Sequence, residues 1–225
     1  MRLSWKTLEL CKVKLGKGNF YGFEKIADDI VDNISEEELG QVFSELTENE
    51  FLNQENAHIH FSALGQHIFN MMLEPEQYIM VENKVDDIRA RLYIRDTYYL
   101  CVMNDASLSP DGKTESYIIE LLPYLDLVVG SFVHTLNHSE GGMPARESED
   151  VSDICIVGKS WDKNREEVSQ ITAAGNYCEE GICCQISEWN QDKKVVQRDV
   201  VGENCELINW LTSWLFKQIS EGEAV

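Results

Sequence analysis

The stretch RARLYIRDTYYLCVMN, residues 89–104, decides how the rest of the chain can fold. A period of two between apolar and more polar side chains, as in this stretch, is typical of strands that bury one face. Arg95, Asp96 and Thr97 lie where the chain must turn between two such strands. The stretch therefore predicts a β-hairpin. Its apolar positions are Leu92, Ile94, Tyr98, Leu100 and Val102.

The residues after this hairpin predict a loop, a third strand and a helix. The polar run 104–114 contains Pro, Asp and Gly, which is typical of a loop. Residues 117–122 predict a strand that is closed off by Pro123. The spacing of apolar residues then changes to three and four, the period of a buried helix face. The residues with this spacing are Leu125, Val128, Val129, Phe132, Val133 and Leu136.

The C-terminal part of the chain has the same order of elements. Alternating apolar residues predict strands between 154 and 187, a turn at 190–193 and a returning strand at 195–201. An amphipathic helix follows, with its apolar stripe at Leu207, Ile208, Leu211, Trp214, Leu215 and Ile219. No residue-level repeat relates the two halves, so they share architecture at most. Between them, the Gly-rich and acidic run 138–153 predicts a mobile loop.

The N-terminal part predicts three helices, a short β excursion and a further helix, the order of a winged-helix-like unit. Ser35 and Glu38 form a capping box at the start of the third helix. The apolar residues of this helix, expected to point inward, are Leu39, Val42, Phe43 and Leu46. Residues 36–50 contain six Glu and no Lys or Arg, so the helix that would read DNA repels phosphate. The unit is expected to serve packing or protein contact.

Together these patterns predict an α+β fold with an antiparallel sheet built from two similar hairpin-strand-helix halves and a helical, winged-helix-like N-terminal part. The helices are expected on one face of the sheet. We expect a single domain over residues 1–225. It comprises a helical N-terminal segment at 1–76, the first sheet and helix half at 77–137, the acidic loop at 138–153 and the second half at 154–225.

The composition narrows the class of partner. The 225 residues carry a formal net charge of −21, and 43% of them are hydrophobic. Affinity for nucleic acid comes mainly from Lys and Arg that neutralise phosphates, so this charge disfavours a nucleic-acid-binding protein. It disfavours binding to an anionic membrane surface for the same reason. It is compatible with a soluble protein that binds basic or amphipathic protein partners.

The compartment follows from the cysteines and the apolar runs. The chain has seven Cys, an odd number, and the residues after Met1 lack the apolar run of a signal peptide. No window is long and apolar enough for a transmembrane span. We therefore expect a cytoplasmic protein with reduced thiols.

Candidate chemical groups are few. His58 and His60 lie two residues apart on a possible strand, but no third metal ligand is near them in the sequence. The vicinal pair Cys183 and Cys184 would sense redox state only with exposure and a lowered pKa. His134 lies on an apolar helix face and is expected in the core. No nucleophile, phosphate-loop or dinucleotide motif occurs. We expect a protein that is not an enzyme and binds no cofactor or metal.

The order of these segments resembles the EspG family of type VII (ESX) secretion chaperones, in its divergent, Firmicutes-type form. The segments that carry the resemblance are Leu-Ser-Trp-Lys-Thr-Leu-Glu-Leu at 3–10, Leu-Gly-Gln-His-Ile-Phe at 64–69, Leu-Glu-Pro-Glu at 73–76 and Leu-Leu-Pro at 121–123. The resemblance covers nearly the whole chain and concerns the order of the segments and the spacing of their hydrophobic residues. It implies a cytosolic α+β protein that holds the aggregation-prone helical tip of a secretion substrate before export, without catalytic residues.

If the resemblance holds, the contact surface is expected at the tip of the central hairpin together with the acidic loop. Aromatic residues and Arg beside a turn are unusual unless they are buried or bound to a partner. An ordinary edge hairpin is the alternative explanation. The residues expected to bind the partner are Tyr93, Arg95, Asp96, Tyr98 and Tyr99.

Other classes of protein remain open at this point. An acidic α+β protein could be an immunity protein that neutralises a cognate toxin, because its charge would match a basic nuclease. It could be a transcriptional regulator of winged-helix type, although the Glu-rich third helix argues against this. It could also be an enzyme with dispersed catalytic residues, which nothing in the sequence supports.

Overall fold

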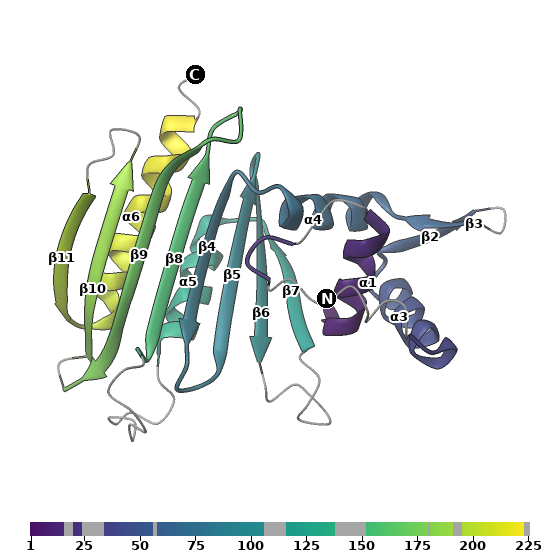
Figure 1. Ribbon diagram of the computed structural model, residues 1–225, viewed down its shortest axis with the longest axis horizontal. Coiled ribbons are helices and arrows are strands. Elements are labelled where there is room, and N and C mark those ends of the chain that lie inside the picture. Colours follow the sequence, from purple (N-terminus) through teal and green to yellow (C-terminus); the bar gives the residue numbers. More distant parts are fainter. Residues whose placement is uncertain are drawn as a thin grey trace.

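A nine-stranded antiparallel sheet forms the centre of the computed structural model (Figure 1). Its strand order is β1-β7-β6-β5-β4-β8-β9-β10-β11. A separate two-stranded hairpin, β2-β3, lies in the N-terminal part. The structure describes residues 1–15, 20–23, 34–55, 58–105, 116–137, 152–179, 181–190 and 195–222.

Two similar halves meet in the middle of this sheet. The first half consists of β4 (Gln77–Asn83), β5 (Ile88–Arg95), β6 (Tyr98–Asp105), β7 (Ser116–Leu122) and α5 (Leu125–Leu136). The second consists of β8 (Ile154–Trp161), β9 (Glu167–Cys178), β10 (Gly181–Asn190), β11 (Val195–Gly202) and α6 (Asn204–Gly222). β4 pairs with β8, with Ile79 opposite Gly158, so the order of strands outward from this seam is the same in both halves. The predicted α+β class, built from two hairpin-strand-helix halves, is confirmed.

The central hairpin turns where the sequence predicts it. Ile94 lies opposite Tyr99, and Arg95 lies opposite Tyr98, so the turn consists of Asp96 and Thr97. Asp96 has a φ of 53°, in the left-handed region that Asp and Asn tolerate better than most residues. The polar loop was predicted at 104–114, but Asn104 and Asp105 belong to β6, and residues 106–114 lie outside the described residues.

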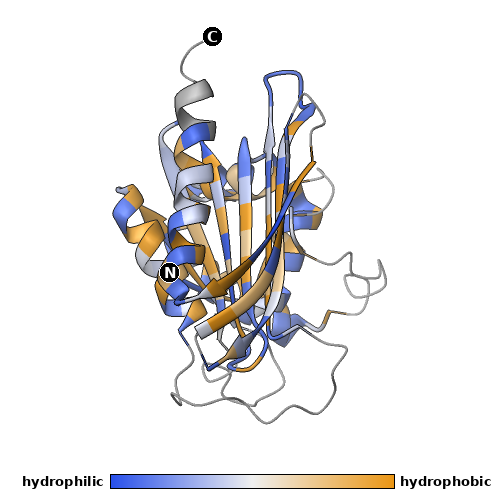
Figure 2. Ribbon diagram, turned by 90° about the vertical axis from the view of Figure 1, so that its left-hand side faces the viewer, coloured by the Kyte–Doolittle hydropathy of each residue, from blue (hydrophilic) through white to orange (hydrophobic). Residues whose placement is uncertain are grey.

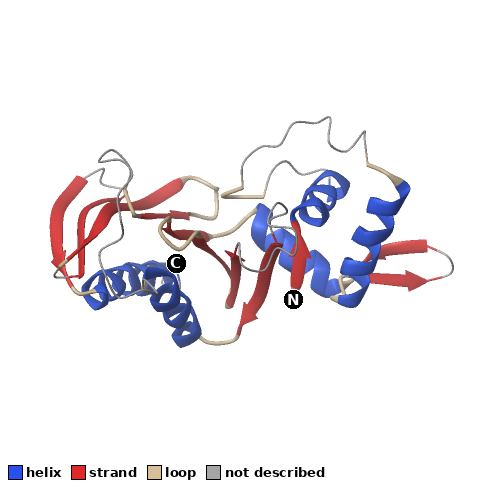
Figure 3. Ribbon diagram, turned by 90° about the horizontal axis from the view of Figure 1, so that it is seen from below, coloured by secondary structure: helices blue, strands red, loops and turns tan. Residues whose placement is uncertain are grey.

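One face of the sheet is covered by α5 and α6, which contact each other (Figure 3). Buried and more exposed residues alternate along β8 and β9, so every second side chain of these strands is available for this layer, and Figure 2 shows hydrophobic and hydrophilic residues interspersed in the sheet. The fully buried members of this core include Ile79, Ile156, Ile171, Phe132 and Leu211. Most of the apolar stripe that the sequence predicts for each helix faces the sheet, but Val133 of α5 is exposed, and the side chain of Ile219 in α6 lies outside the described residues. His134, expected in the core, is instead exposed on α5.

The opposite face of the first half is covered by the N-terminal part. This region consists of β1 (Arg2–Ser4), α1 (Trp5–Leu15), α3 (Glu36–Glu48), β2 (Leu52–Glu55), β3 (His58–Phe61) and α4 (Ala63–Leu73). Its core joins Leu8 of α1 and Phe69 of α4 to Tyr78, Tyr93 and Tyr117 of the sheet. The expectation of helices on one face is therefore wrong. Strands β4 to β7 are apolar on both faces, which requires a layer on each side.

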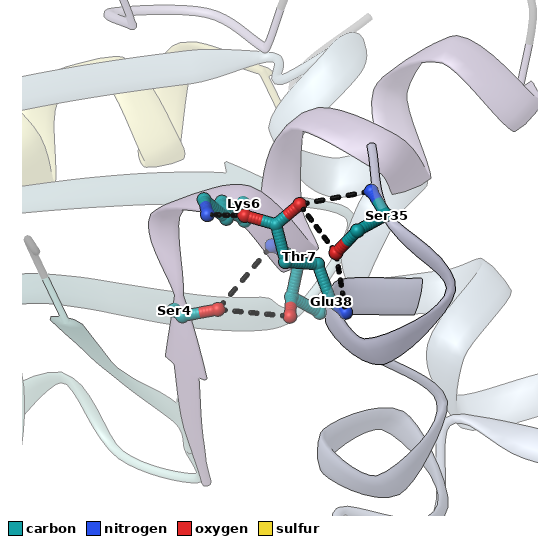
Figure 4. Close-up of polar contacts among 5 residues, drawn as sticks. All are labelled: Ser4, Lys6, Thr7, Ser35 and Glu38. Carbon is teal, nitrogen blue, oxygen red and sulfur yellow. Dashed lines mark hydrogen bonds and ion pairs between the residues drawn. The ribbon is translucent and has the colours of Figure 1, made fainter. Parts of the chain in front are cut away.

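The start of α3 shows how the N-terminal part is joined internally (Figure 4). The Ser35 hydroxyl accepts a hydrogen bond from the Glu38 amide, and the Glu38 carboxylate accepts one from the Ser35 amide, as the capping box predicts. The same carboxylate forms an ion pair with Lys6 of α1. The Lys6 ammonium, followed by the Ser35 hydrogen bonds, lowers the pKa of Glu38 to about 2.

The orientation of α3 differs in part from the expectation. Val42 and Leu46 are buried, as expected, whereas the side chains of Leu39 and Phe43 are 38% and 39% exposed. α3 contacts α1, β1 and β2, and these contacts leave Leu39 and Phe43 exposed. The result is an apolar ridge of Leu39 and Phe43 beside exposed Glu36 and Glu37.

Candidate partner-binding surface

The tip of the β5–β6 hairpin is fixed to the segment that precedes β4. The amide of Asp96 donates a hydrogen bond to Oε2 of Glu76 (3.0 Å). The amide of Glu76 in turn donates to the carbonyl of Ile94 (2.8 Å). These two bonds hold the turn in one position, and Asp96 and Thr97 themselves are exposed at its end.

Arg95 connects the hairpin tip to the C-terminal end of α4. Its Nη1 atom lies 3.4 Å from the carbonyl oxygens of Asn70 and Glu74, to which it donates, and 3.7 Å from Oε2 of Glu74. A cation is favourable at a helix C-terminus because the last carbonyls carry partial negative charge. The side chain of Arg95 is 35% exposed. It therefore serves the fold and is also accessible from solvent.

The three Tyr residues of the hairpin lie in three different environments. Tyr93 is fully buried in the N-terminal core, its hydroxyl donates to the carbonyl of Tyr21 (2.8 Å), and burial raises its pKa well above the usual value. Tyr99 is half-buried against the core under α5 and α6. Tyr98 is 47% exposed, on the same face as Arg95.

The ring of Tyr98 meets the imidazole of His67 from α4. The two ring centroids are 4.5 Å apart at an interplanar angle of 74°. Nε2 of His67 is buried and has no hydrogen-bond partner among the described residues. The exposed patch at this corner consists of Tyr98, Arg95, Asp96 and the flanking Glu74, and we call it the hairpin-tip patch.

The structure brings together three of the five residues that the sequence singled out, Arg95, Asp96 and Tyr98. Tyr99 is half-buried on the opposite face of the hairpin, and Tyr93 lies inside. Tyr93 is inaccessible, so it is not a member of the hairpin-tip patch. Sequence reasoning missed His67, Glu74 and Glu76, which reach the hairpin from α4 and from the segment after it. Their proximity depends on the packing of α4 onto β5, which no local pattern encodes. The acidic loop expected to share this surface falls almost entirely outside the described residues, at 138–151.

The structure bears on the hypotheses of a metal site and of a membrane span. His58 and His60 are exposed on β3, where they lie opposite Glu55 and Asn53. In the part of the chain that the structure describes, no group of three or more His, Cys, Asp or Glu is arranged to hold a metal ion. Among the helices of the same residues, none has the length and apolar character that a membrane span requires.

The cysteines differ from the expectation of seven reduced thiols. Cys178 and Cys183 form a disulfide across the β9–β10 turn, with their Cα atoms 6.1 Å apart. Cys184 is buried and free. Neighbouring residues of a strand point to opposite faces, so Cys183 faces Cys178 across the hairpin and not its sequence neighbour.

No protein-family model matches the chain, and no curated protein matches it in sequence. Its fold is similar to that of the Mycobacterium tuberculosis type VII secretion system chaperone EspG5, whose structure was solved in complex with the PE25–PPE41 dimer. The similarity has a TM-score of 0.55 at 6% sequence identity and covers 95% of this chain and 94% of the EspG5 chain. The two proteins therefore share an overall fold. At this low sequence identity, the fold is the only property that the comparison covers.

Proposed function

We propose that this protein is a non-enzymatic, chaperone-like binding protein that keeps a helical export substrate of a type VII secretion system soluble in the cytoplasm. The observation that carries the proposal is the fold similarity to a type VII secretion chaperone over nearly the full length of both chains. EspG5 was solved with a protein dimer bound, and this supports a protein partner here.

The hairpin-tip patch supplies a physical reason for such a role. An exposed aromatic ring beside an Arg is the combination that is enriched where protein interfaces concentrate their binding energy. Tyr98 and Arg95 are held by contacts to α4, so neither must be ordered when a partner binds. The net charge of −21 keeps the free chaperone soluble and gives specificity through the rim of the interface.

The test is an affinity purification of the full chain from its native cells, with bound proteins identified by mass spectrometry and then reconstituted in pure form. We expect a helical secretion substrate whose binding is lost when its helical tip is deleted. Tyr98→Ala is expected to weaken binding of the pure substrate at least tenfold, the effect of losing an interface anchor.

Tyr124→Ala is the matched control, because Tyr124 is 69% exposed at the start of α5, outside the hairpin-tip patch. It is expected to leave the affinity unchanged. Equal affinities for Tyr98→Ala and the wild type would remove the hairpin-tip patch from the proposal. Recovery of a toxic enzyme that is inhibited in the complex would instead make the protein an immunity protein.

A further inference from the structure

We propose that Cys178 and Cys183 form a reversible redox site, which a small-molecule disulfide oxidises and a small-molecule thiol reduces, and which restrains the end of the sheet where α5 ends and α6 begins. The inference does not depend on the identity of the partner. It begins from the β9–β10 turn, where the two residues are bonded to each other.

The backbone places these two residues at bonding distance. Cys178 pairs with Gly181 and Cys183 pairs with Asn176, so both Cys side chains lie on the same face of neighbouring strands. Their Cα separation of 6.1 Å is within the range that a disulfide spans without backbone movement. Both residues are half-buried, and they lie on the face of the sheet opposite α5 and α6. A small thiol or disulfide can therefore reach them.

The other thiols are poorly suited to the same chemistry. Burial raises the pKa of Cys11 to about 12 and that of Cys101 to about 11. It also raises the pKa of Cys155 and of Cys184. The thiolate is the reactive form in disulfide exchange, so these four groups exchange slowly. Cys205 is exposed but has no bonded partner Cys.

The reaction balances with a small-molecule disulfide as the oxidant. One Cys thiolate attacks a sulfur of that disulfide, forms a mixed disulfide and releases one small thiol. The second Cys thiolate then attacks the protein sulfur of the mixed disulfide and releases the other small thiol. Two protein thiols are oxidised, one small disulfide is reduced, and the two protons leave on the two small thiols.

The β9–β10 turn, which holds the bond, lies at the same end of the sheet as the start of α6 (Figure 1). Tyr177, next to Cys178, donates its hydroxyl to the carbonyl of Leu136 at the end of α5 (2.8 Å), and its amide donates to Asp153 (3.0 Å). Asn204 of α6 donates to the same Leu136 carbonyl (3.1 Å). Oxidation therefore restrains a turn whose hydrogen bonds lead directly to both helices.

The first measurement counts thiols in the full-length protein after equilibration with mixtures of reduced and oxidised glutathione. Quenching, unfolding and labelling with a maleimide polymer then show the number of free thiols on a gel. We expect one transition from seven thiols to five as the oxidised fraction rises, assigned by peptide mapping to Cys178 and Cys183. Cys205→Ser is the matched control, with a transition from six to four.

Two variants complete the thiol count. Cys178→Ser and Cys183→Ser are expected to remove the two-thiol transition. A wild-type protein that keeps seven thiols, or five, across all mixtures would overturn the proposal. A two-thiol transition that persists in Cys178→Ser would overturn it as well.

The second measurement is hydrogen exchange of the oxidised and reduced wild-type protein. Peptides from the β9–β10 turn and the start of α6 are expected to exchange about thirtyfold more slowly when oxidised, the entropic effect of closing a loop of this size. Peptides from the β5–β6 hairpin are expected to be unchanged. Equal exchange of the turn in both states would refute the restraining role.

Discussion

Replacement of Ser169 by Ala tests how α6 packs onto the second half of the sheet. Nε1 of Trp214 donates a hydrogen bond to the Ser169 hydroxyl over 3.0 Å, and the hydroxyl in turn donates to the carbonyl of Trp189 over 3.2 Å. Trp214 is 3% exposed and Ser169 is 2% exposed. Removal of the hydroxyl leaves a buried indole N–H and a carbonyl without this partner.

The expected cost follows from the burial of these groups. An unsatisfied buried donor costs about 1–3 kcal/mol, so we expect Ser169→Ala to lower the free energy of unfolding by about 2 kcal/mol. For a domain of this size, that corresponds to a decrease in Tm of about 4–8 °C. Urea denaturation followed by far-UV circular dichroism measures the change without depending on Trp fluorescence.

A double-mutant cycle separates the hydrogen bond from other effects. In a Trp214→Phe background the donor is already absent, so Ser169→Ala is expected to cost about 1 kcal/mol less than in the wild type. Ser213→Ala is the control, because the Ser213 hydroxyl bonds the Asn209 carbonyl on the exposed side of α6 and is expected to contribute less than about 0.5 kcal/mol. Equal costs of Ser169→Ala in both backgrounds would refute the reasoning.

Two further predictions concern backbone space and pH. A Cβ atom at Gly175 would lie 2.3 Å from the Cys183 carbonyl oxygen and 2.5 Å from Cα of Cys184, so Gly175→Ala is expected to destabilise the protein by more than about 2 kcal/mol in urea denaturation. Gly40 is an exposed residue of α3, where a Cβ atom would meet nothing within 4 Å. Gly40→Ala is therefore expected to raise the free energy of unfolding by up to about 1 kcal/mol, and a decrease would contradict a helix at this position. The pKa of Glu38 is lowered from 4.5 to about 2, so its contribution to stability is complete above about pH 4.5 and is lost as the pH falls toward 2. The difference in urea midpoint between the wild type and Glu38→Gln is therefore expected to shrink across this window, and a difference independent of pH would refute the assignment.

Local patterns predict the elements of this fold well. The hairpin around Asp96, the Ser35–Glu38 capping box and the buried stripe of α6 all follow from residues within one turn or one strand of each other. These features depend on backbone preferences and on the period of burial, both of which are properties of short segments.

Contacts between distant segments were not predictable in the same way. β1 pairs with β7, and the amino group of Met1 bonds the carbonyl of Ile119, although nothing in the first residues indicates a strand at the sheet edge. Tyr93 and Tyr98 belong to the same alternating stretch, yet one is covered by the segment around Tyr21 and the other remains exposed. The exposure of each residue of the hairpin-tip patch is therefore decided by the N-terminal part, far away in sequence.

The β4–β8 seam has a consequence for how the chain folds during synthesis. β4, β5 and β6 pair with strands that are close to them in the sequence. By contrast, β4 can pair with β8 only after Gly158 and its neighbours have left the ribosome. Until then one edge of β4 exposes unpaired amides and carbonyls beside apolar side chains, the arrangement that recruits other chains into aggregates. The pace at which the second half is translated therefore sets how long each nascent molecule exposes this edge.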